Sequence, residues 1–381
     1  MKRLLIVQPY IPEYRVPLFR LMKHALEQQG IEMKIAAAVS AKNNVDRGDM
    51  SDESEIDFVL KTRSITFRRR DINFRRLAPV ISEYKPDFVI AEQVVKNIEI
   101  YPIVLRRLFG SHLKLAFWGQ GRSFSESQPP WLASMKQMLT KRGDWFFAYT
   151  QEGANAVIQR GFPNNKVTVL NNSTDTESLR RDLGKITRQD VIDFQHSLGL
   201  TPGMTGLFLG GVDQRKGIDF LLKATKLIHK ELPNFRLLVA GEGSESWKVR
   251  DLEKEGGPVR FLGRVNGPEK AKALECSDAL VVPEWIGLVA LDSLASGCPI
   301  ITTSSPTHSP EFFYLNEGQN CLVSDPCVEA YSQLVVETLM SPKLLPEMVE
   351  HGLTESFHYS IEKMADRYVG GIAQWTGEKF E

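Results

Sequence analysis

The stretch from Pro283 to Thr303 constrains the fold most, because it places a loop, a helix and a strand directly after another strand. Apolar runs with the composition of short strands lie at Ala279–Val282 and at Pro299–Thr303. Between them, apolar residues recur at helical spacing, at Leu288, Leu291, Leu294 and Ala295. Gly297 can end that helix in the left-handed conformation. The order strand, loop, helix, strand is typical of a parallel sheet.

The loop before this helix has the chemistry of an anion-binding site. The helix would begin near Gly287, at the carboxyl end of a parallel strand, where free backbone N–H groups and the helix dipole attract phosphate. Glu284 precedes the helix and Asp292 lies eight positions later. Both carboxylates can therefore face one crevice and accept hydrogen bonds from sugar and ribose hydroxyls. Taken alone, such a pair is more typical of a solvated loop glutamate and a helix-surface aspartate.

The rest of the chain repeats the strand–helix pattern in two blocks. It opens with a buried-strand run at Leu4–Pro9, a helix over Arg15–Gln29 and a second strand at Glu32–Ala38. The pattern restarts at Gly206–Gly211, and a length of 381 residues is natural for two domains. The sequence therefore predicts an α/β protein with a parallel sheet in each half.

A second candidate phosphate site lies early in the second block. Arg215 and Lys216 stand in the loop VDQRKG, between the strand at Gly206–Gly211 and a helix predicted over Gly217–Glu231. Two cations beside a helix N-terminus suit a diphosphate. Such a pair in a surface loop is often only solvated, but its place one strand–helix unit into the second block favours a functional interpretation.

These features together resemble the donor-site signature of retaining GT-B glycosyltransferases of the bacterial group 1, or glycosyltransferase family 4-like, type. After a strand come Glu284, seven residues, an acidic residue and a turn with Gly297 and Pro299 into the next strand. The resemblance covers nearly the whole chain and implies a GT-B architecture, with two Rossmann-like domains facing across a cleft. The implied parts are an N-terminal acceptor domain (1–176), a linker with a connecting helix (177–204), a nucleotide-sugar donor domain (205–358) and a C-terminal helix that crosses back toward the first domain (359–381).

The resemblance also implies roles for individual residues. Lys216 matches the lysine that holds the donor diphosphate, Glu284 would orient the transferred sugar, and Asp292 would bind the ribose. Further donor-side candidates are Arg215, Gly211, Arg264, Val265, Gly287, Leu288, Val289, Glu311, Glu242 and His308. Candidates for the acceptor side or the cleft are Tyr14, Arg15 and Gln120. Arg15 either reaches a phosphate or an anionic acceptor, or it is a surface arginine that caps its loop.

Three positions depart from the family pattern. Gly211 stands where the family carries an arginine, Gln120 where it often carries a histidine, and Asp292 where it usually carries a glutamate. Because a glutamine side chain donates hydrogen bonds but does not titrate, we expect no histidine-type proton chemistry at position 120.

The implied reaction is transfer of a sugar from a nucleotide-sugar donor to a hydroxyl of a saccharide or lipid-linked saccharide, with retention at the anomeric carbon. Bacterial surface polysaccharide or lipopolysaccharide synthesis is the expected setting. The resemblance implies no metal and no cofactor, and the sequence has no cluster of carboxylates and histidines that suits a metal. Two alternatives are a GT-B nucleotide-sugar epimerase and a non-catalytic nucleotide-sugar-binding partner protein.

Charge gives a separate indication of partners. Lys and Arg total 47, as do Asp and Glu, so no net charge favours nucleic acid. The most basic stretch mixes arginines with aromatic and aliphatic residues, which suits an anionic membrane surface or a solvated helix face. Its arginines are Arg63, Arg68, Arg69, Arg70, Arg75 and Arg76, with Arg106 and Arg107 as a possible extension. Without a long apolar run, and with a first strand predicted from Leu4, we expect a cytoplasmic protein that can associate peripherally with the inner membrane face.

Overall fold

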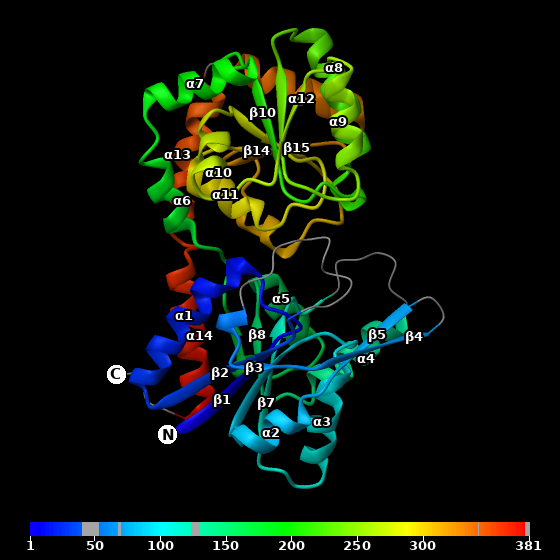
Figure 1. Cartoon of the computed structure of the whole chain (residues 1–381), viewed down its shortest axis with the longest axis vertical. Helices are drawn as coiled ribbons and strands as arrows, with labels where there is room; N and C mark the ends of the chain where they lie inside the picture. The colour runs from blue at the N-terminus through cyan, green and yellow to red at the C-terminus, as the bar shows by residue number, and fades with distance from the viewer. Residues whose placement is uncertain (40–52, 68–69, 123–129, 342, 378–381) are drawn as a thin grey trace. The chain divides into compact units, whose positions relative to one another are not determined.

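The computed structural model describes residues 1–39, 53–67, 70–122, 130–341 and 343–377. The chain divides into two compact units, one formed by residues 1–174 with 361–381 and the other by residues 175–360. Each unit has a parallel sheet covered by helices on both faces (Figure 1). The prediction of two Rossmann-like halves is therefore confirmed.

The first unit contains a seven-stranded sheet in the order β3-β2-β1-β6-β7-β8-β9, in which all neighbouring strands are parallel. Its strands are β1 (Lys2–Val7), β2 (Ile31–Ala37), β3 (Phe58–Val59), β6 (Phe88–Glu92), β7 (Lys114–Gly119), β8 (Trp145–Ala148) and β9 (Val167–Val169). Its helices are α1 (Val16–Gln28), α2 (Ala78–Tyr84), α3 (Tyr101–Leu108), α4 (Pro130–Thr140), α5 (Gln151–Gln159) and α14 (Ile361–Thr376). Helices α1 and α14 lie side by side on one face of this sheet, and α2 and α3 cover the other (Figure 1).

The central strands of this sheet are buried on both faces, which is why they are apolar throughout rather than alternating. Trp118 of β7 and Phe147 of β8 pack against Tyr368 of α14, with ring centroids 5.2 and 4.6 Å away. Phe117 and Phe146, one position earlier on each strand, belong to the cluster on the opposite face. The C-terminal helix is therefore part of the core of the first unit.

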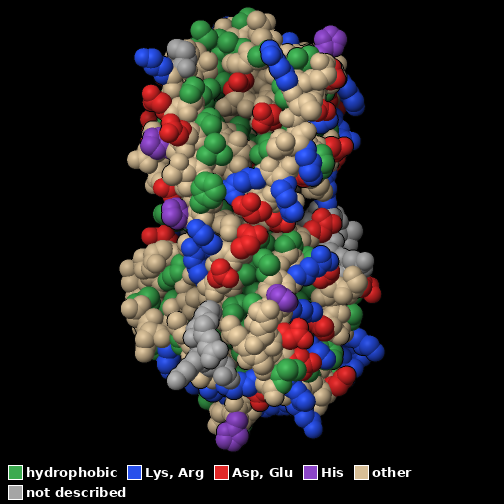
Figure 2. Space-filling model, turned by 90° about the vertical axis from the view of Figure 1, so that its left-hand side faces the viewer, with side chains coloured by type: hydrophobic (Ala, Val, Ile, Leu, Met, Phe, Trp, Pro, Cys, Tyr) green, Lys and Arg blue, Asp and Glu red, His purple; other side chains and the backbone are tan. Residues whose placement is uncertain are grey.

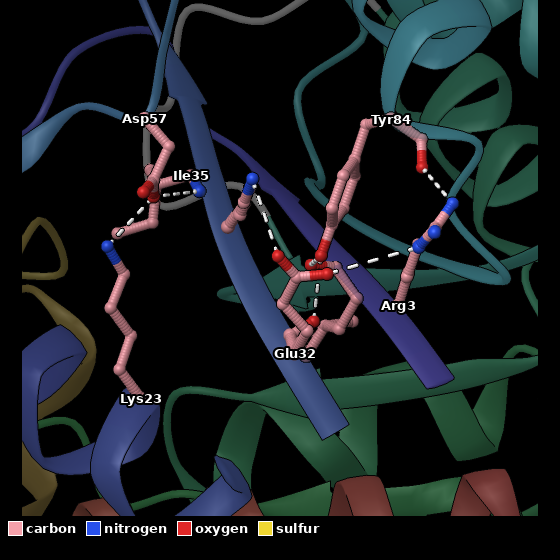
Figure 3. Close-up of polar contacts among 8 residues, drawn as sticks. Arg3, Lys23, Glu32, Ile35, Asp57 and Tyr84 are labelled. Atoms are coloured by element: carbon pink, nitrogen blue, oxygen red, sulfur yellow. Dashed lines mark hydrogen bonds and ion pairs between the residues drawn. The ribbon is translucent and has the colours of Figure 1, made fainter. Parts of the chain in front are cut away.

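Polar contacts fix the edge of this sheet (Figure 3). The Asp57 carboxylate accepts hydrogen bonds from the Ile35 backbone N–H and from Lys23 Nζ, both at 2.8 Å, and so ties β2 to α1. The Tyr84 hydroxyl donates to the Glu32 carbonyl at 2.9 Å. These bonds satisfy backbone groups near the edge that would otherwise need another strand.

The second unit contains a six-stranded parallel sheet in the order β12-β11-β10-β13-β14-β15. Its strands are β10 (Thr205–Leu209), β11 (Arg236–Ala240), β12 (Val259–Gly263), β13 (Ala279–Val281), β14 (Ile300–Thr303) and β15 (Cys321–Ser324). Its helices are α6 (Thr176–Leu183), α7 (Arg188–Leu198), α8 (Ile218–Glu231), α9 (Ser246–Lys254), α10 (Gly267–Glu275), α11 (Val289–Ser296), α12 (Val328–Met340) and α13 (Leu344–Ser356). The strand order reverses between β10 and β13, which makes this the switch point where doubly wound sheets bind ligands.

Residues 177–204, predicted to be a linker with a connecting helix, lie mostly in α6 and α7. Both helices belong to the second unit, and α6 packs against α10 and α11. Their low apolar content hides this role in the sequence, because only one face of each helix contacts the unit.

The basic stretch forms a hairpin, β4 (Thr62–Phe67) with β5 (Arg70–Arg75), so its interpretation as a solvated helix face is wrong. The prediction that Arg75 faces a membrane is also wrong, because Arg75 is 6% exposed and forms an ion pair with Glu99. Arg63 and Arg76 are exposed. Arg68, Arg69 and the side chain of Arg70 lie outside what the structure describes. On the face drawn in Figure 2, basic and acidic side chains are interspersed.

Candidate functional site

The carboxyl edge of the second sheet has closely crossing backbones that only glycine permits. A Cβ atom at Gly241 would lie 1.8 Å from the Gly210 carbonyl oxygen, and one at Gly243 would lie 2.3 Å from the Val212 carbonyl oxygen. Gly210 and Gly241 also have φ angles of 142° and 148°, which other residues rarely adopt. The absence of side chains here lets the segments after β10 and β11 bond closely, with the Gly210 N–H donating to the Ala240 carbonyl at 3.0 Å and the Val212 N–H donating to the Glu242 carbonyl at 3.1 Å.

Lys216 follows β10 in a short 3₁₀ turn, Gln214–Lys216, that Asp213 caps. Its Nζ donates a hydrogen bond to the Trp285 carbonyl at 2.7 Å, which connects the loop after β10 to the loop after β13. Burial lowers the pKa of Lys216 to about 8, although Asp213 and Glu311 act in the opposite direction. A partly exposed cation whose Nζ has one neutral partner is poised to bind an anion.

Glu284, in the loop after β13, packs against Gly217, the residue that follows this lysine. A Cβ atom at Gly217 would be 3.1 Å from the Glu284 carboxyl carbon, so the carboxyl group packs directly against the start of α8. Burial raises the pKa of Glu284 above its ordinary value. The structure therefore brings the two predicted catalytic residues together at the switch point of the sheet.

Trp285 is a site residue that sequence reasoning missed. Its φ of 53° is rare for a bulky residue, and its ring centroid lies 5.3 Å from the Arg215 guanidinium carbon. The Arg215 guanidinium also bonds Asp213, with Nη2 3.0 Å from Oδ2. Trp285 thus contacts both predicted phosphate-binding cations, Arg215 through its ring and Lys216 through its carbonyl. Only its position next to Glu284 could have indicated this.

Gly211 faces the same acidic group, because a Cβ atom there would lie 3.4 Å from Asp213 Oδ2. Position 211 thus offers no side-chain cation, and Arg215 is the second cation of this loop.

The segment after β14 contributes two buried residues near Lys216, His308 and Glu311. His308 is buried, its Nδ1 accepts the Ile286 N–H at 3.0 Å, and its Nε2 donates to the Thr303 carbonyl at 2.8 Å. Both ring nitrogens therefore bind backbone, which argues against the predicted sugar contact. Burial lowers the pKa of His308, so the neutral ring is favoured. Glu311 is also buried, and its Oε2 accepts the Ser309 hydroxyl at 2.7 Å.

The helix that follows Glu284 begins where the sequence predicts. Val289 is its first residue, after Gly287 and Leu288, so the orphan N–H groups of its first turn lie next to Glu284 in the chain. Asp292, inside the first turn, forms an ion pair with Lys270 of α10 at 2.6 Å. A ribose would therefore have to share this carboxylate with Lys270.

The other donor-side candidates are spread along β11 and β12. Arg264 is exposed and Val265 buried, directly after β12. Glu242 pairs with Arg250 at 2.6 Å and approaches Gly263, where a Cβ atom would lie 3.6 Å from Glu242 Oε1. These residues extend the same edge of the sheet, as expected for the base side of a nucleotide.

In the first unit, the predicted acceptor-side residues have a different environment. Arg15 is 3% exposed, and its guanidinium carbon lies 5.0, 4.7 and 5.5 Å from the ring centroids of Tyr14, Trp118 and Tyr149. The interpretation as a surface arginine is therefore wrong, because three aromatic rings enclose the cation. Glu92, at the end of β6, has its pKa raised by burial and partly offset by Arg15.

Gln120 lies in a loop held by backbone contacts. A Cβ atom at Gly121 would lie 2.1 Å from the Gly153 carbonyl oxygen, and the Gly121 N–H donates to Gln93 Oε1 at 3.1 Å. Gln120 itself is partly exposed at the carboxyl edge of β7. Its predicted place at a strand end is correct, because β7 ends at Gly119.

Similarity to known proteins follows this division of the chain. Residues 204–341 match the family model described as glycosyl transferases group 1. An uncharacterized glycosyltransferase, MJ1607, of Methanocaldococcus jannaschii is 32% identical over 149 residues, or 37% of each chain. Phosphatidyl-myo-inositol mannosyltransferase of Mycolicibacterium smegmatis is 32% identical over 106 residues, covering 26% of this chain and 28% of that one.

Structural similarity extends over both units. The crystal structure of Anabaena Alr3699/HepE in complex with UDP matches 98% of this chain and 100% of that one, with a TM-score of 0.72 and 13% identity. Two Rossmann-like halves with this topology define the GT-B fold. Residues 204–341, within the second unit, carry the domain of the group 1 glycosyl transferases. The chain spans less than two thirds of the length of the curated relatives that it matches.

No helix among the described residues has the length and hydrophobicity needed to cross a membrane. Within the same residues, no group of three or more His, Cys, Asp or Glu side chains is arranged to hold a metal ion.

Proposed function

We propose that this protein transfers a sugar from a nucleotide-sugar donor to a hydroxyl of a saccharide or lipid-linked acceptor. One observation carries the proposal: Lys216 and Glu284 meet at the β10/β13 switch point, each following one of the two strands between which the strand order reverses. The group 1 domain and the UDP complex of a protein with the same fold support a nucleoside diphosphate at this edge.

The proposed chemistry rests on charge stabilisation. The bond between the anomeric carbon and the diphosphate oxygen breaks, and the acceptor oxygen forms the new bond on the same face of the sugar. The acceptor proton passes to the departing diphosphate, so no protein nucleophile, metal or cofactor is required. Lys216 would leave the Trp285 carbonyl for the diphosphate, whose growing negative charge it stabilises. Arg215 would serve as the second cation.

Glu284 would orient the sugar, because its carboxylate packs against Gly217, next to Lys216 in the chain, and can accept hydroxyl hydrogen bonds. The N–H groups at Gly287, Leu288 and Val289, with Asp292, Glu311, Arg264 and Val265, would hold the rest of the donor. Gln120 and Tyr14 would contact the acceptor. Surface polysaccharide synthesis in the cytoplasm is the proposed setting.

Ligand-induced thermal shifts with UDP, GDP, ADP and their sugars test donor binding first, because a ligand that binds only the native state raises its stability. Transfer is then measured for Glu284→Gln, with exposed Glu269→Gln in α10 as the matched control. We expect Glu284→Gln to lower the transfer rate by roughly 100-fold and the control to retain it. A folded Glu284→Gln variant with the full rate would contradict the assigned role.

The same assays separate the alternative functions. Donor consumed at an equal rate without any acceptor would indicate a nucleotide-sugar epimerase or hydrolase. Selective nucleotide binding without turnover would indicate a non-catalytic partner protein. Transfer that depends on the acceptor supports the proposal.

We also propose peripheral association with an anionic membrane. Helix α3 exposes Leu105 and Leu108, the adjoining Phe109 is 83% exposed, and Arg106 lies between the two leucines. Apolar residues next to cations favour the headgroup region of anionic lipids. Phe109→Ala should weaken binding to phosphatidylglycerol vesicles several-fold, whereas the exposed Phe313→Ala of the second unit should not. Equal binding by both variants would refute this surface.

A further inference from the structure

The first unit contains a cavity of about 500 Å³ between the end of the β4–β5 hairpin and helices α2 and α3. Its size is in the range of small-molecule sites. Most of its wall is apolar, formed by Phe74, Leu77, Ile81, Pro102, Ile103 and Leu113. No residue of the group 1 signature contributes to it, so it is separate from the donor site.

Charged residues line one part of this cavity. Arg75 and Glu99 are both buried and neutralise each other, and Asn97 Oδ1 accepts a hydrogen bond from Arg75 at 3.3 Å. A buried ion pair costs desolvation energy and is weak evidence of a stabilising role. Glu99 Oε2 is buried without a hydrogen-bond partner among the described residues, and such orphan polar atoms need an explanation. The wall therefore keeps polar groups at an energetic cost.

Two further arginines give the cavity its net charge. Arg76 and Arg106 line it, both are exposed, and neither has an ion pair among the described residues. Because Arg75 and Glu99 cancel, the field in the cavity is positive. Two free guanidinium groups beside an apolar wall match a ligand with a phosphate at one end and a hydrocarbon chain at the other.

We propose that this cavity binds the hydrocarbon chain of a single-chain lipid phosphate, with the phosphate held by Arg76 and Arg106. That this lipid is part of the acceptor substrate rests on the proposed function. That the cavity binds a lipid phosphate does not rest on it. A nucleotide fits less well, because the wall offers one aromatic ring, Phe74, and few hydrogen-bonding groups for a base. The polar atom of Glu99 would face a protic group of the ligand head.

The first test is calorimetric titration of the full chain with hexyl, octyl and decyl phosphate below their micelle-forming concentrations. Each methylene that enters the apolar wall should tighten binding by about fourfold until the cavity is full. Decyltrimethylammonium has the same chain with a cationic head and should bind at least tenfold more weakly. Equal affinity for the two heads, or no dependence on chain length, would overturn the proposal.

Variants then locate the binding. Arg76→Ala and Arg106→Ala should each weaken decyl phosphate binding by roughly tenfold, whereas Arg142→Ala, an exposed arginine of the same unit outside the cavity, should not. Ser82→Trp would fill the cavity from an exposed position on α2 and should abolish the dependence on chain length. Unchanged binding by all three cavity variants would place the ligand elsewhere and overturn the proposal.

The same samples distinguish this inference from the proposed function. A selective nucleotide shift without decyl phosphate binding would refute the cavity assignment alone. Decyl phosphate binding without any nucleotide shift would support the cavity and refute the transferase. If a second copy of the chain or another segment of it occupies the cavity, no alkyl phosphate will bind, and that result also overturns the inference.

Discussion

The two sheets of this protein reverse their strand order at equivalent points and place a cation and a carboxylate at each. In the first unit, Arg15 follows β1 and Glu92 ends β6, and aromatic rings enclose the arginine. In the second unit, Lys216 follows β10 and Glu284 follows β13, and the lysine has one carbonyl partner. The same topology therefore supports a packed cation in one unit and an available cation in the other.

This difference teaches that the fold fixes where charged residues meet, and the neighbouring side chains decide what they can do. Three aromatic rings surround the Arg15 guanidinium with apolar surface and make cation–π contacts with it; they belong to Tyr14, Trp118 and Tyr149. Lys216 instead lies beside Gly210, where a Cβ atom would be 3.6 Å from Lys216 Nζ, and it is partly exposed whereas Arg15 is buried. Of the two cations, Lys216 is therefore the more accessible to a phosphate.

Alanine substitutions at the glycines where two backbone segments cross closely should give the largest effects on the free energy of unfolding. Gly241→Ala places a Cβ atom 1.8 Å from Gly210 O, and Gly121→Ala places one 2.1 Å from Gly153 O. Each should destabilise its own unit by roughly 3 kcal/mol or more, because backbone atoms must move. Denaturant unfolding measures the loss. Nucleotide shifts should disappear for Gly241→Ala and persist for Gly121→Ala.

Two open glycines provide controls for that comparison. Gly203 and Gly110 also have positive φ angles, but a Cβ atom at either would meet nothing within 4 Å. Their alanine variants should lose only about 1 kcal/mol, the cost of the left-handed conformation. If Gly203→Ala destabilised the second unit as much as Gly241→Ala, the backbone crossing would not be the cause.

Two partly buried lysines should give the next largest effect on stability. Burial lowers the pKa of Lys216 and of Lys136, in the first unit, to about 8 from 10.5. Between pH 8 and 10.5 the unfolded chain binds more protons than the folded one, so stability should rise with pH in that window. Lys216→Met and Lys136→Met should each remove a rise of roughly 3 kcal/mol, measured by denaturant unfolding at both pH values.

Nucleotide binding should have the opposite pH dependence, and only one lysine should control it. A diphosphate favours protonated Lys216, so UDP affinity should fall as the pH rises above 8. Lys216→Met should bind UDP weakly and without that fall, whereas Lys136→Met should behave as the unmodified protein. If Lys136→Met instead abolished the fall in UDP affinity, the titration of Lys136 in the first unit would control diphosphate binding.

The sequence was sufficient for the sheet and for the pair Lys216 and Glu284, because strand ends follow from local hydrophobic patterns. It was insufficient for Arg15, whose burial depends on rings from β7 and β8 and on Met364 of α14. The ion pair between Asp292 and Lys270 likewise depends on the packing of two helices. Side-chain partners that come from distant segments are not encoded in local spacing.

Trp285 should have a smaller effect, confined to the second unit. Trp285→Ala removes the ring that packs on Arg215 and should weaken UDP binding by roughly threefold to fivefold, since a cation–π contact at an exposed site contributes about 0.5–1 kcal/mol. Trp247→Ala, an exposed tryptophan of the same unit, is the matched control. Equal UDP affinity of Trp285→Ala and the unmodified protein would show that Asp213, the other partner of the Arg215 guanidinium, is sufficient to position it.

Helix caps should give the smallest effects and compare the two units at the level of single hydrogen bonds. Thr150 caps α5 of the first unit by accepting the Gly153 N–H, and Thr187 caps α7 of the second unit in a capping box with Asp190. Each Thr→Ala change should cost about 1 kcal/mol in denaturant unfolding. Thr187→Ala should also raise the pKa of Asp190, which hydrogen bonds from Thr187 now lower to about 2. An NMR titration that finds the pKa of Asp190 unchanged would show that Lys272, its other partner, is sufficient to hold the carboxylate, and that the box contributes little to α7.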